Sequence, residues 1–135
     1  MINDIITPVR AEACAFLYFT LKGKWYDMIL CGGKREEYRD FKPYWGVRFR
    51  HVAAKANALA DGNGKPIVVC AFSRGRKKAD LFFECEGIAG HTENSYRCTN
   101  PPHEAWGEPH APHYVIKLGR RVQPIRNMEA HYEGK

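Results

Sequence analysis

The sequence predicts an α+β fold in which two helices pack on a mixed, curled sheet. Strand-like and helix-like segments follow one another along the chain, and one almost continuous apolar run is typical of a central strand. The 135 residues are enough for one domain with one hydrophobic core. We therefore expect a single domain that spans residues 1–135.

The first predicted elements are a buried strand and a short helix. After a lead that ends near Pro8, residues 15–21 are rich in aromatic side chains, as in a buried strand. Trp25 and Met28 then fall at helical spacing. Gly32–Gly33 supplies residues that can leave the helix with a positive φ, so we expect the helix to end there.

A short polar strand is predicted over residues 36–40. Pro43 closes this segment, because proline restricts the residue before it to extended conformations. Side chains alternate between the two faces of a strand, so Glu37 and Arg39 are expected on one face.

A second helix is predicted after Pro43. Its apolar positions repeat at helical spacing: Trp45, Phe49, Val52, Ala53, Ala56 and Leu59. The opposite face carries Arg48, His51 and Lys55. We therefore expect an amphipathic helix with a basic outer face.

The second half of the chain is predicted to contain three strands. Residues 61–64 form a turn signal, and the apolar run 67–72 that follows is typical of a central strand. Residues 81–86 indicate its antiparallel partner, and residues 114–118 a last strand that ends before a glycine. Residues 90–113 lack periodicity and predict a long loop of the kind that often carries function.

Composition favours a cytoplasmic protein with an anionic partner. Apolar runs such as Ile67–Phe72 are far too short to span a bilayer, and the N-terminus lacks a signal-peptide pattern. The net charge of +6 favours a nucleotide or nucleic acid, although ordinary solubility charge explains it equally well. We interpret the five cysteines as reduced thiols, because no CxxC pair occurs: Cys14, Cys31, Cys70, Cys85 and Cys98.

One segment resembles the signature of the ASCH family, Gly-x-Lys-x-x-Glu-x-Arg. Gly32, Lys34, Glu37 and Arg39 fill this pattern in register. The resemblance continues through further landmarks in chain order: residues 42–45, residues 72–76, Trp106–Pro109 and residues 114–119. On these residues the chain is identified as a member of the ASCH family.

The resemblance implies a PUA-like β-barrel with a cleft beside the first helix, and an association with RNA. One branch of the family removes the acyl group from cytidine acylated on its exocyclic amine. That branch uses a lysine at the position of Lys34, a threonine three residues later and a distant glutamate. The threonine position is Glu37 here, so a threonine nucleophile is not expected, although a lysine flanked by carboxylates can activate water instead.

The expected catalytic residues are Lys34, Glu37 and Glu108, the last chosen by its place in the long loop over Glu104 and Glu93. The expected substrate-binding residues are Lys22, Arg39, Trp45, Ser73 and Arg74. Each has a plainer interpretation: a solvated lysine at 34, an exposed ion pair between Glu37 and Arg39, a core tryptophan at 45, or a solvated basic loop.

Three functions remain open from the sequence. The first is an amidohydrolase that acts on N4-acylated cytidine or a related acylated pyrimidine nucleoside, without a cofactor. The second is a non-catalytic RNA-binding module that uses the same cleft together with the basic helix face, and the third is a ribonuclease. We expect no metal, because the spacing fits no standard site in His91, Cys98, His103, His110 and His113. We expect a monomer or weak dimer whose partner is a pyrimidine nucleoside or RNA, with no membrane association.

Overall fold

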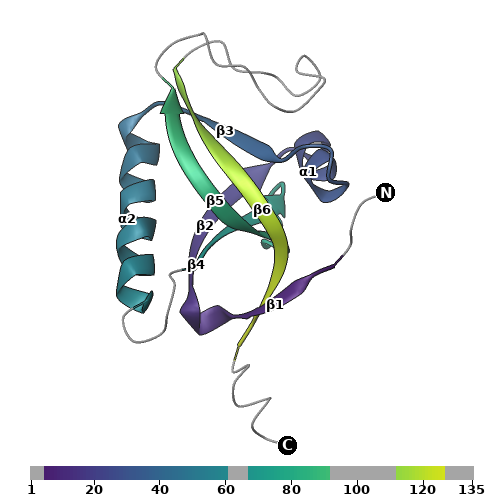
Figure 1. Ribbon diagram of the computed structural model, residues 1–135. Helices are drawn as coiled ribbons and strands as arrows, with labels where there is room; N and C mark the ends of the chain where they lie inside the picture. The colour runs from purple at the N-terminus through teal and green to yellow at the C-terminus, as the bar shows by residue number, and fades with distance from the viewer. Residues whose placement is uncertain (1–4, 61–66, 92–111, 127–135) are drawn as a thin grey trace, which may run out of the picture.

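The computed structural model describes residues 5–60, 67–91 and 112–126, and the structural statements below concern these residues (Figure 1). They form six strands, a 3-10 turn and two helices. In chain order the elements are β1 Thr7–Arg10, η1 Ala11–Ala13, β2 Cys14–Leu21, α1 Gly23–Leu30, β3 Glu36–Asp40, α2 Pro43–Ala60, β4 Ile67–Arg74, β5 Leu81–His91 and β6 His113–Ile125.

The sheet is mixed and open. Its main path runs β1-β6-β5-β4-β2, and β3 also pairs with β6. β3 and β5 pair with the same part of β6, both antiparallel to it, so they occupy its opposite edges. β2 and β3 are thus two ends of the sheet, and no backbone ladder joins them. The predicted α+β class, with two helices and a mixed, curled sheet, is confirmed; a closed ring of strands is not formed.

β4 is the central strand that the apolar run predicts. It lies between β2 and β5, parallel to the first and antiparallel to the second. Eight residue pairs join β2 and β4 in register, from Cys14–Ile67 to Leu21–Arg74. Because neighbours cover both edges of β4 and both of its faces are packed, residues 69–73 are all buried.

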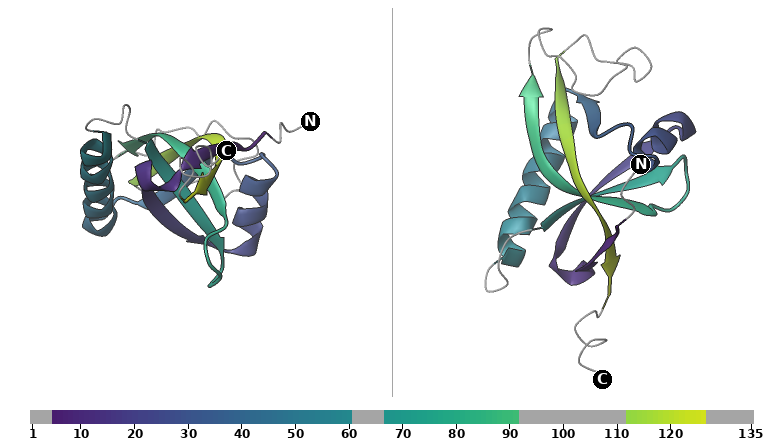
Figure 2. Two further views of the ribbon diagram at one scale, coloured as in Figure 1. Left: turned by 90° about the horizontal axis from the view of Figure 1, so that it is seen from below. Right: turned by 45° about the vertical axis from the view of Figure 1, so that its right-hand side comes forward.

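Alternation along β2 defines the core. Its odd-numbered side chains are buried, whereas Tyr18 and Thr20 on the other face are exposed. The predicted apolar face of α2 packs on the buried side of β2 through Phe49, Val52 and Ala56. Figure 2 shows α2 along one side of the sheet and α1 on the other. The predicted outer face, with Arg48, His51 and Lys55, is exposed.

Three strands depart clearly from the prediction. β5 continues past the predicted 81–86 to His91 and so includes the start of the predicted 90–113 loop. β1 is an additional short strand, and it pairs in parallel with the end of β6. β6 does not stop at Gly119 but continues to Ile125. At Gly119 an added Cβ would lie 2.9 Å from Cγ of Glu86 and 3.3 Å from the carbonyl oxygen of Glu84. The glycine therefore permits a close strand contact beside the β-bulge in β5 and does not end the strand.

Other sequence-based expectations fall partly outside the described residues. The turn at 61–64, most of the 90–113 loop and Cys98 lie outside the described residues. The four cysteines in the described ranges are free thiols, and burial raises the pKa of Cys14 to about 11. In those same ranges neither helix combines the length and apolar character that crossing a membrane requires.

A hydrogen bond fixes α1 against the β4–β5 turn. The hydroxyl of Tyr26 donates to Oδ1 of Asp80 at 2.7 Å. Burial of the ring, followed by this hydrogen bond, raises the pKa of Tyr26 to about 12. The contact holds the helix that carries Trp25.

We expect Tyr26→Phe to lower the free energy of unfolding by about 1 kcal/mol at pH 7, because one hydrogen bond to a carboxylate is lost. The raised pKa contributes stability that is fully present below pH 10 and is lost as the pH rises toward 12. Urea denaturation at pH 7 and at pH 10.5 measures both effects. If Tyr26→Phe lowered the free energy of unfolding more at pH 10.5 than at pH 7, the result would contradict this hydrogen bond.

Candidate functional site

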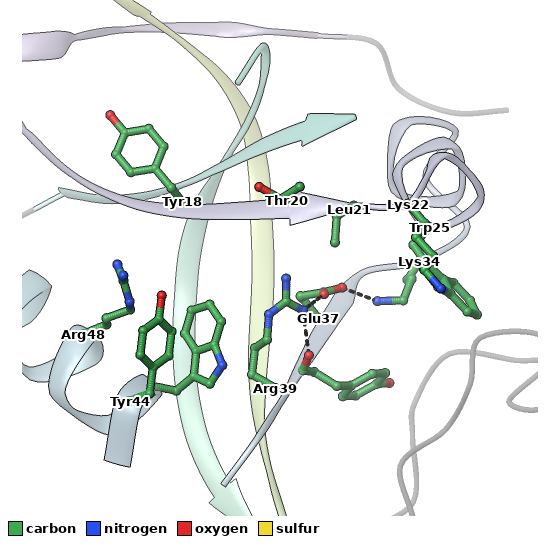
Figure 3. A pocket seen from close by; sticks show the side chains of 12 residues that line it. Tyr18, Thr20, Leu21, Lys22, Trp25, Lys34, Glu37, Arg39, Tyr44 and Arg48 are labelled. Atoms are coloured by element: carbon green, nitrogen blue, oxygen red, sulfur yellow. Dashed lines mark hydrogen bonds and ion pairs between the residues drawn. The ribbon is translucent and has the colours of Figure 1, made fainter. Parts of the chain in front are cut away.

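A cavity of about 680 Å³, here called the central cavity, lies where the sheet fails to close (Figure 3). One wall comes from β2 and the other from β3, and residues at the starts of α1 and α2 complete the lining. The lining residues are Tyr18, Thr20, Leu21, Lys22, Trp25, Lys34, Glu37, Tyr38, Arg39, Tyr44, Trp45 and Arg48. The central cavity thus occupies the gap between the two ends of the sheet.

The turn after α1 directs Lys34 into this cavity. Gly32 has a φ of 86°, as the helix-ending glycine pattern predicts, whereas Gly33 is not in that conformation. The backbone N–H of Lys34 donates to the carbonyl of Met28 at 3.0 Å, which ties the turn to the helix. Lys34 is only 3% exposed, so the interpretation as a solvated surface lysine is wrong.

Glu37 lies between two cations. The Lys34 ammonium donates to Oε1 of Glu37 at 2.7 Å and to the backbone carbonyl of Glu36 at 2.5 Å. Nη1 of Arg39 donates to the other carboxylate oxygen, Oε2. The ion pair with Arg39 is formed, but Glu37 is only 5% exposed, so this is not the exposed pair of the plainer interpretation. The two faces predicted for this strand explain the geometry, since residues 37 and 39 point to the same side.

Arg39 is held by stacking as well as by charge. Its guanidinium carbon lies 4.8 Å from the ring centre of Phe19 and 5.1 Å from that of Trp45. Nη1 also donates to the carbonyl of Tyr38 at 2.8 Å. Among the described residues, these bonds leave Nε and Nη2 of Arg39 available to a ligand. Arg39 therefore both positions Glu37 and offers donors to the central cavity.

Aromatic rings form much of the remaining surface of the central cavity. Trp45 stacks on Phe19 with ring centres 5.6 Å apart and meets Tyr44 edge-on at 5.2 Å. Trp45 therefore packs against the hydrophobic core and also lines the central cavity, so both interpretations of this residue apply in part. The guanidinium of Arg48 lies 4.3 Å over the ring of Tyr44. Flat apolar faces next to charged groups suit a planar ligand with polar edges.

The structure brings most of the predicted site residues together. Lys34, Glu37, Lys22, Arg39 and Trp45 all line the central cavity. The predicted third catalytic residue, Glu108, lies outside the described residues.

Two predicted binding residues are not part of the central cavity. Arg74 pairs with Oδ2 of Asp27 at 3.2 Å and packs over Gly23, because the parallel pairing of β2 with β4 brings it beside α1. Ser73 is buried, and its hydroxyl lies 3.2 Å from the carbonyl of Gly75 and 3.4 Å from Oγ1 of Thr20.

Sequence reasoning missed several lining residues, among them Tyr18, Trp25 and Tyr38. For Tyr18 a signal was present, since it is an aromatic residue on the face of β2 opposite to the buried odd-numbered side chains. For Trp25 no such signal exists, because its helical spacing with Met28 indicates core packing equally well.

No family model, curated protein or solved structure matches this chain. The geometry of the central cavity is therefore the basis for inferring a function.

We expect Glu37→Gln to lower the free energy of unfolding by about 3–5 kcal/mol, because it leaves the buried Lys34 ammonium and the partly buried Arg39 guanidinium without their carboxylate. Urea denaturation measures the loss. The matched control is Glu84→Gln, which breaks an exposed ion pair with Arg120 and should cost less than about 1 kcal/mol. Equal losses for the two variants would contradict the buried arrangement.

Proposed function

We propose that the chain is an ASCH-type amidohydrolase that removes an acyl group from the exocyclic amine of a pyrimidine nucleoside, with N4-acylated cytidine as the model substrate. The observation that carries the proposal is the Lys34–Glu37 pair. These two polar side chains are almost fully buried, hydrogen-bonded to each other at 2.7 Å, and line an aromatic cavity. The resemblance of Gly32, Lys34, Glu37 and Arg39 to the ASCH signature supports the same conclusion.

The cavity suits a nucleoside in size and surface. Its volume of about 680 Å³ falls within the range of about 300–1,000 Å³ that is typical of small-molecule sites. Trp25, Tyr38, Tyr44 and Trp45 supply faces on which a base can stack. Lys34 and Arg39 supply donors for the carbonyl oxygen of an acyl group. A flat base with an amide on its edge meets both requirements.

The proposed reaction is direct hydrolysis. Glu37 accepts a proton from water as the water oxygen attacks the acyl carbonyl carbon and forms a new C–O bond. The carbonyl electron pair moves to its oxygen, where N–H groups of Lys34 and Arg39 stabilise the negative charge. When the C–N bond breaks, Glu37 returns the proton to the leaving nitrogen, which yields the free amine and a carboxylic acid. The sum is one amide and one water consumed, with no other reactant.

The Lys34 ammonium has one N–H group that can donate a hydrogen bond to the substrate. Its nitrogen uses two tetrahedral positions for the bonds to Glu37 and to the carbonyl of Glu36, and one for its own side chain. The nitrogen also lies 4.9 Å from the ring centre of Tyr38, and among the described residues no oxygen or nitrogen acceptor occupies the fourth position. We therefore assign Lys34 the role of donor to the acyl oxygen, a narrower role than the base or nucleophile that the family resemblance allows.

Lys34→Ala should lower turnover of N4-acetylcytidine by at least about a hundredfold, because a donor to the transition state is removed. Release of cytidine, followed by chromatography, measures the rate. Lys34→Arg should not restore it, since the larger planar guanidinium cannot take the place of the ammonium between Glu37 and the carbonyl of Glu36.

Circular dichroism and urea denaturation must accompany these variants, because Lys34 is buried and its loss affects stability as well as rate. Arg74→Ala is the matched control, as it removes an exposed cation outside the central cavity. A folded Lys34→Ala protein with near wild-type turnover would overturn the proposed site. A wild-type protein that binds structured RNA and hydrolyses none of a panel of acylated cytidines would be a binding module instead.

A further inference from the structure

Tyr18 lies where three cavities meet. It is 61% exposed on the outer face of β2 and lines the central cavity. It also lines a cavity of about 490 Å³ that includes Lys77, Lys78 and Arg126, here called the lysine cavity. It further lines a cavity of about 220 Å³ with Arg48, His51 and Lys55, here called the helix cavity. Figure 3 shows Tyr18 and Arg48 on the same side of the central cavity.

The two outer cavities are basic and aromatic. No aspartate or glutamate is among the described residues that line either of them. Their rings come from Phe16 and Tyr18, stacked with centres 6.0 Å apart, and in the lysine cavity also from Phe82, whose ring lies edge-on to Phe16 at 6.4 Å. An anionic ligand with planar groups fits this combination.

Some surface cations of the described residues are neutralised by a carboxylate, and others, including three at these cavities, are not. Arg74, Arg120 and Lys42 each form an ion pair with a carboxylate. Within the described part of the chain, Lys77, Lys78 and Lys55 form no such pair. Their charges are therefore available to an external anion, and they line the two outer cavities that share Tyr18.

We propose that the substrate of the central cavity is a nucleotide within a single-stranded polynucleotide, with the flanking nucleotides bound across Tyr18. This inference rests on the nucleoside site proposed above. The modified base enters the central cavity, a neighbouring base stacks on Tyr18, and phosphates of the two flanks meet the lysine cavity and the helix cavity. A duplex does not suit this surface, because its bases are already stacked and paired. A free nucleoside leaves both basic cavities unused.

The test compares removal of the same acetyl group from a free nucleoside and from an oligonucleotide. Free N4-acetylcytidine and octanucleotides with one central N4-acetylcytidine, in RNA and in DNA form, are assayed for deacylation and for binding by fluorescence anisotropy. We expect kcat/KM for at least one octanucleotide to exceed that of the nucleoside by about tenfold or more at 50 mM salt. The octanucleotide value should fall steeply toward 200 mM salt, and the nucleoside value should stay within about twofold.

The lysine cavity is tested by Lys77→Gln/Lys78→Gln. Because this double variant removes two cations that bind phosphate, octanucleotide affinity should fall about tenfold or more at 100 mM salt and the salt slope should decrease by about one. The matched control is Lys42→Gln/Arg76→Gln, which removes the same charge, including one residue of the same loop, from positions that line neither outer cavity. The control should change octanucleotide affinity by less than about twofold.

The outcomes separate this inference from the proposed function. If the free nucleoside is deacylated and neither octanucleotide binds or reacts better, the polynucleotide inference is overturned and the amidohydrolase stands. If an octanucleotide binds with the expected salt dependence and nothing is deacylated, the hydrolysis is overturned and the polynucleotide surface stands. Equal losses for the two double variants would show non-specific charge attraction and overturn the inference.

Discussion

The rest of the site depends on the buried carboxylate of Glu37. It is 5% exposed and accepts hydrogen bonds from Lys34 and Arg39, so two cations that would otherwise be costly to bury are compensated. The same carboxylate fixes where both cations point. Lys34 is held at one end of it and Arg39 at the other, with the Arg39 guanidinium packed against Phe19 and Trp45. The same hydrogen bonds to Glu37 therefore compensate the two positive charges and fix the orientation of both side chains.

Because the sheet is open, a cavity that can hold a ligand lies beside this interaction. β2 and β3 are two ends of the sheet that no backbone ladder joins, and the central cavity lies between them. A ladder between these strands would place backbone where a ligand can bind. The long β6 keeps the ends apart, because β3 and β5 pair with its opposite edges. The short helix α1 then sets Trp25 and the Gly32 turn at the cavity. Fold and site thus share one cause, a curled sheet that stops short of closure.

The elements of the fold were largely predictable, and their pairing was not. Residues 36–40 form the strand expected from the segment that Pro43 closes, and its alternation places Glu37 and Arg39 on one face. β4 is central because its residues are apolar on both faces. The extension of β6 past Gly119 was missed, since a glycine needed for close contact resembles one that ends a strand. Arg74, which the sequence suggested as a binding residue, does not line the central cavity, because the parallel register of β2 with β4 brings it to Asp27. The pairing register of strands that are distant in the sequence cannot be inferred from local residue patterns.

Nuclear magnetic resonance of the ¹⁵N-labelled protein, titrated with N4-acetylcytidine, tests most directly whether the gap between β2 and β3 is the ligand site. The indole N–H signals of Trp25 and Trp45, assigned by Trp→Phe variants, and the amide of Glu37 should shift together and saturate with one dissociation constant. The amides of Cys85 and Ile88, in an apolar cavity between α2 and β5, provide the internal comparison and should not shift. Saturable shifts at Cys85 and Ile88, with unchanged signals from Trp25, Trp45 and Glu37, would contradict the central claim.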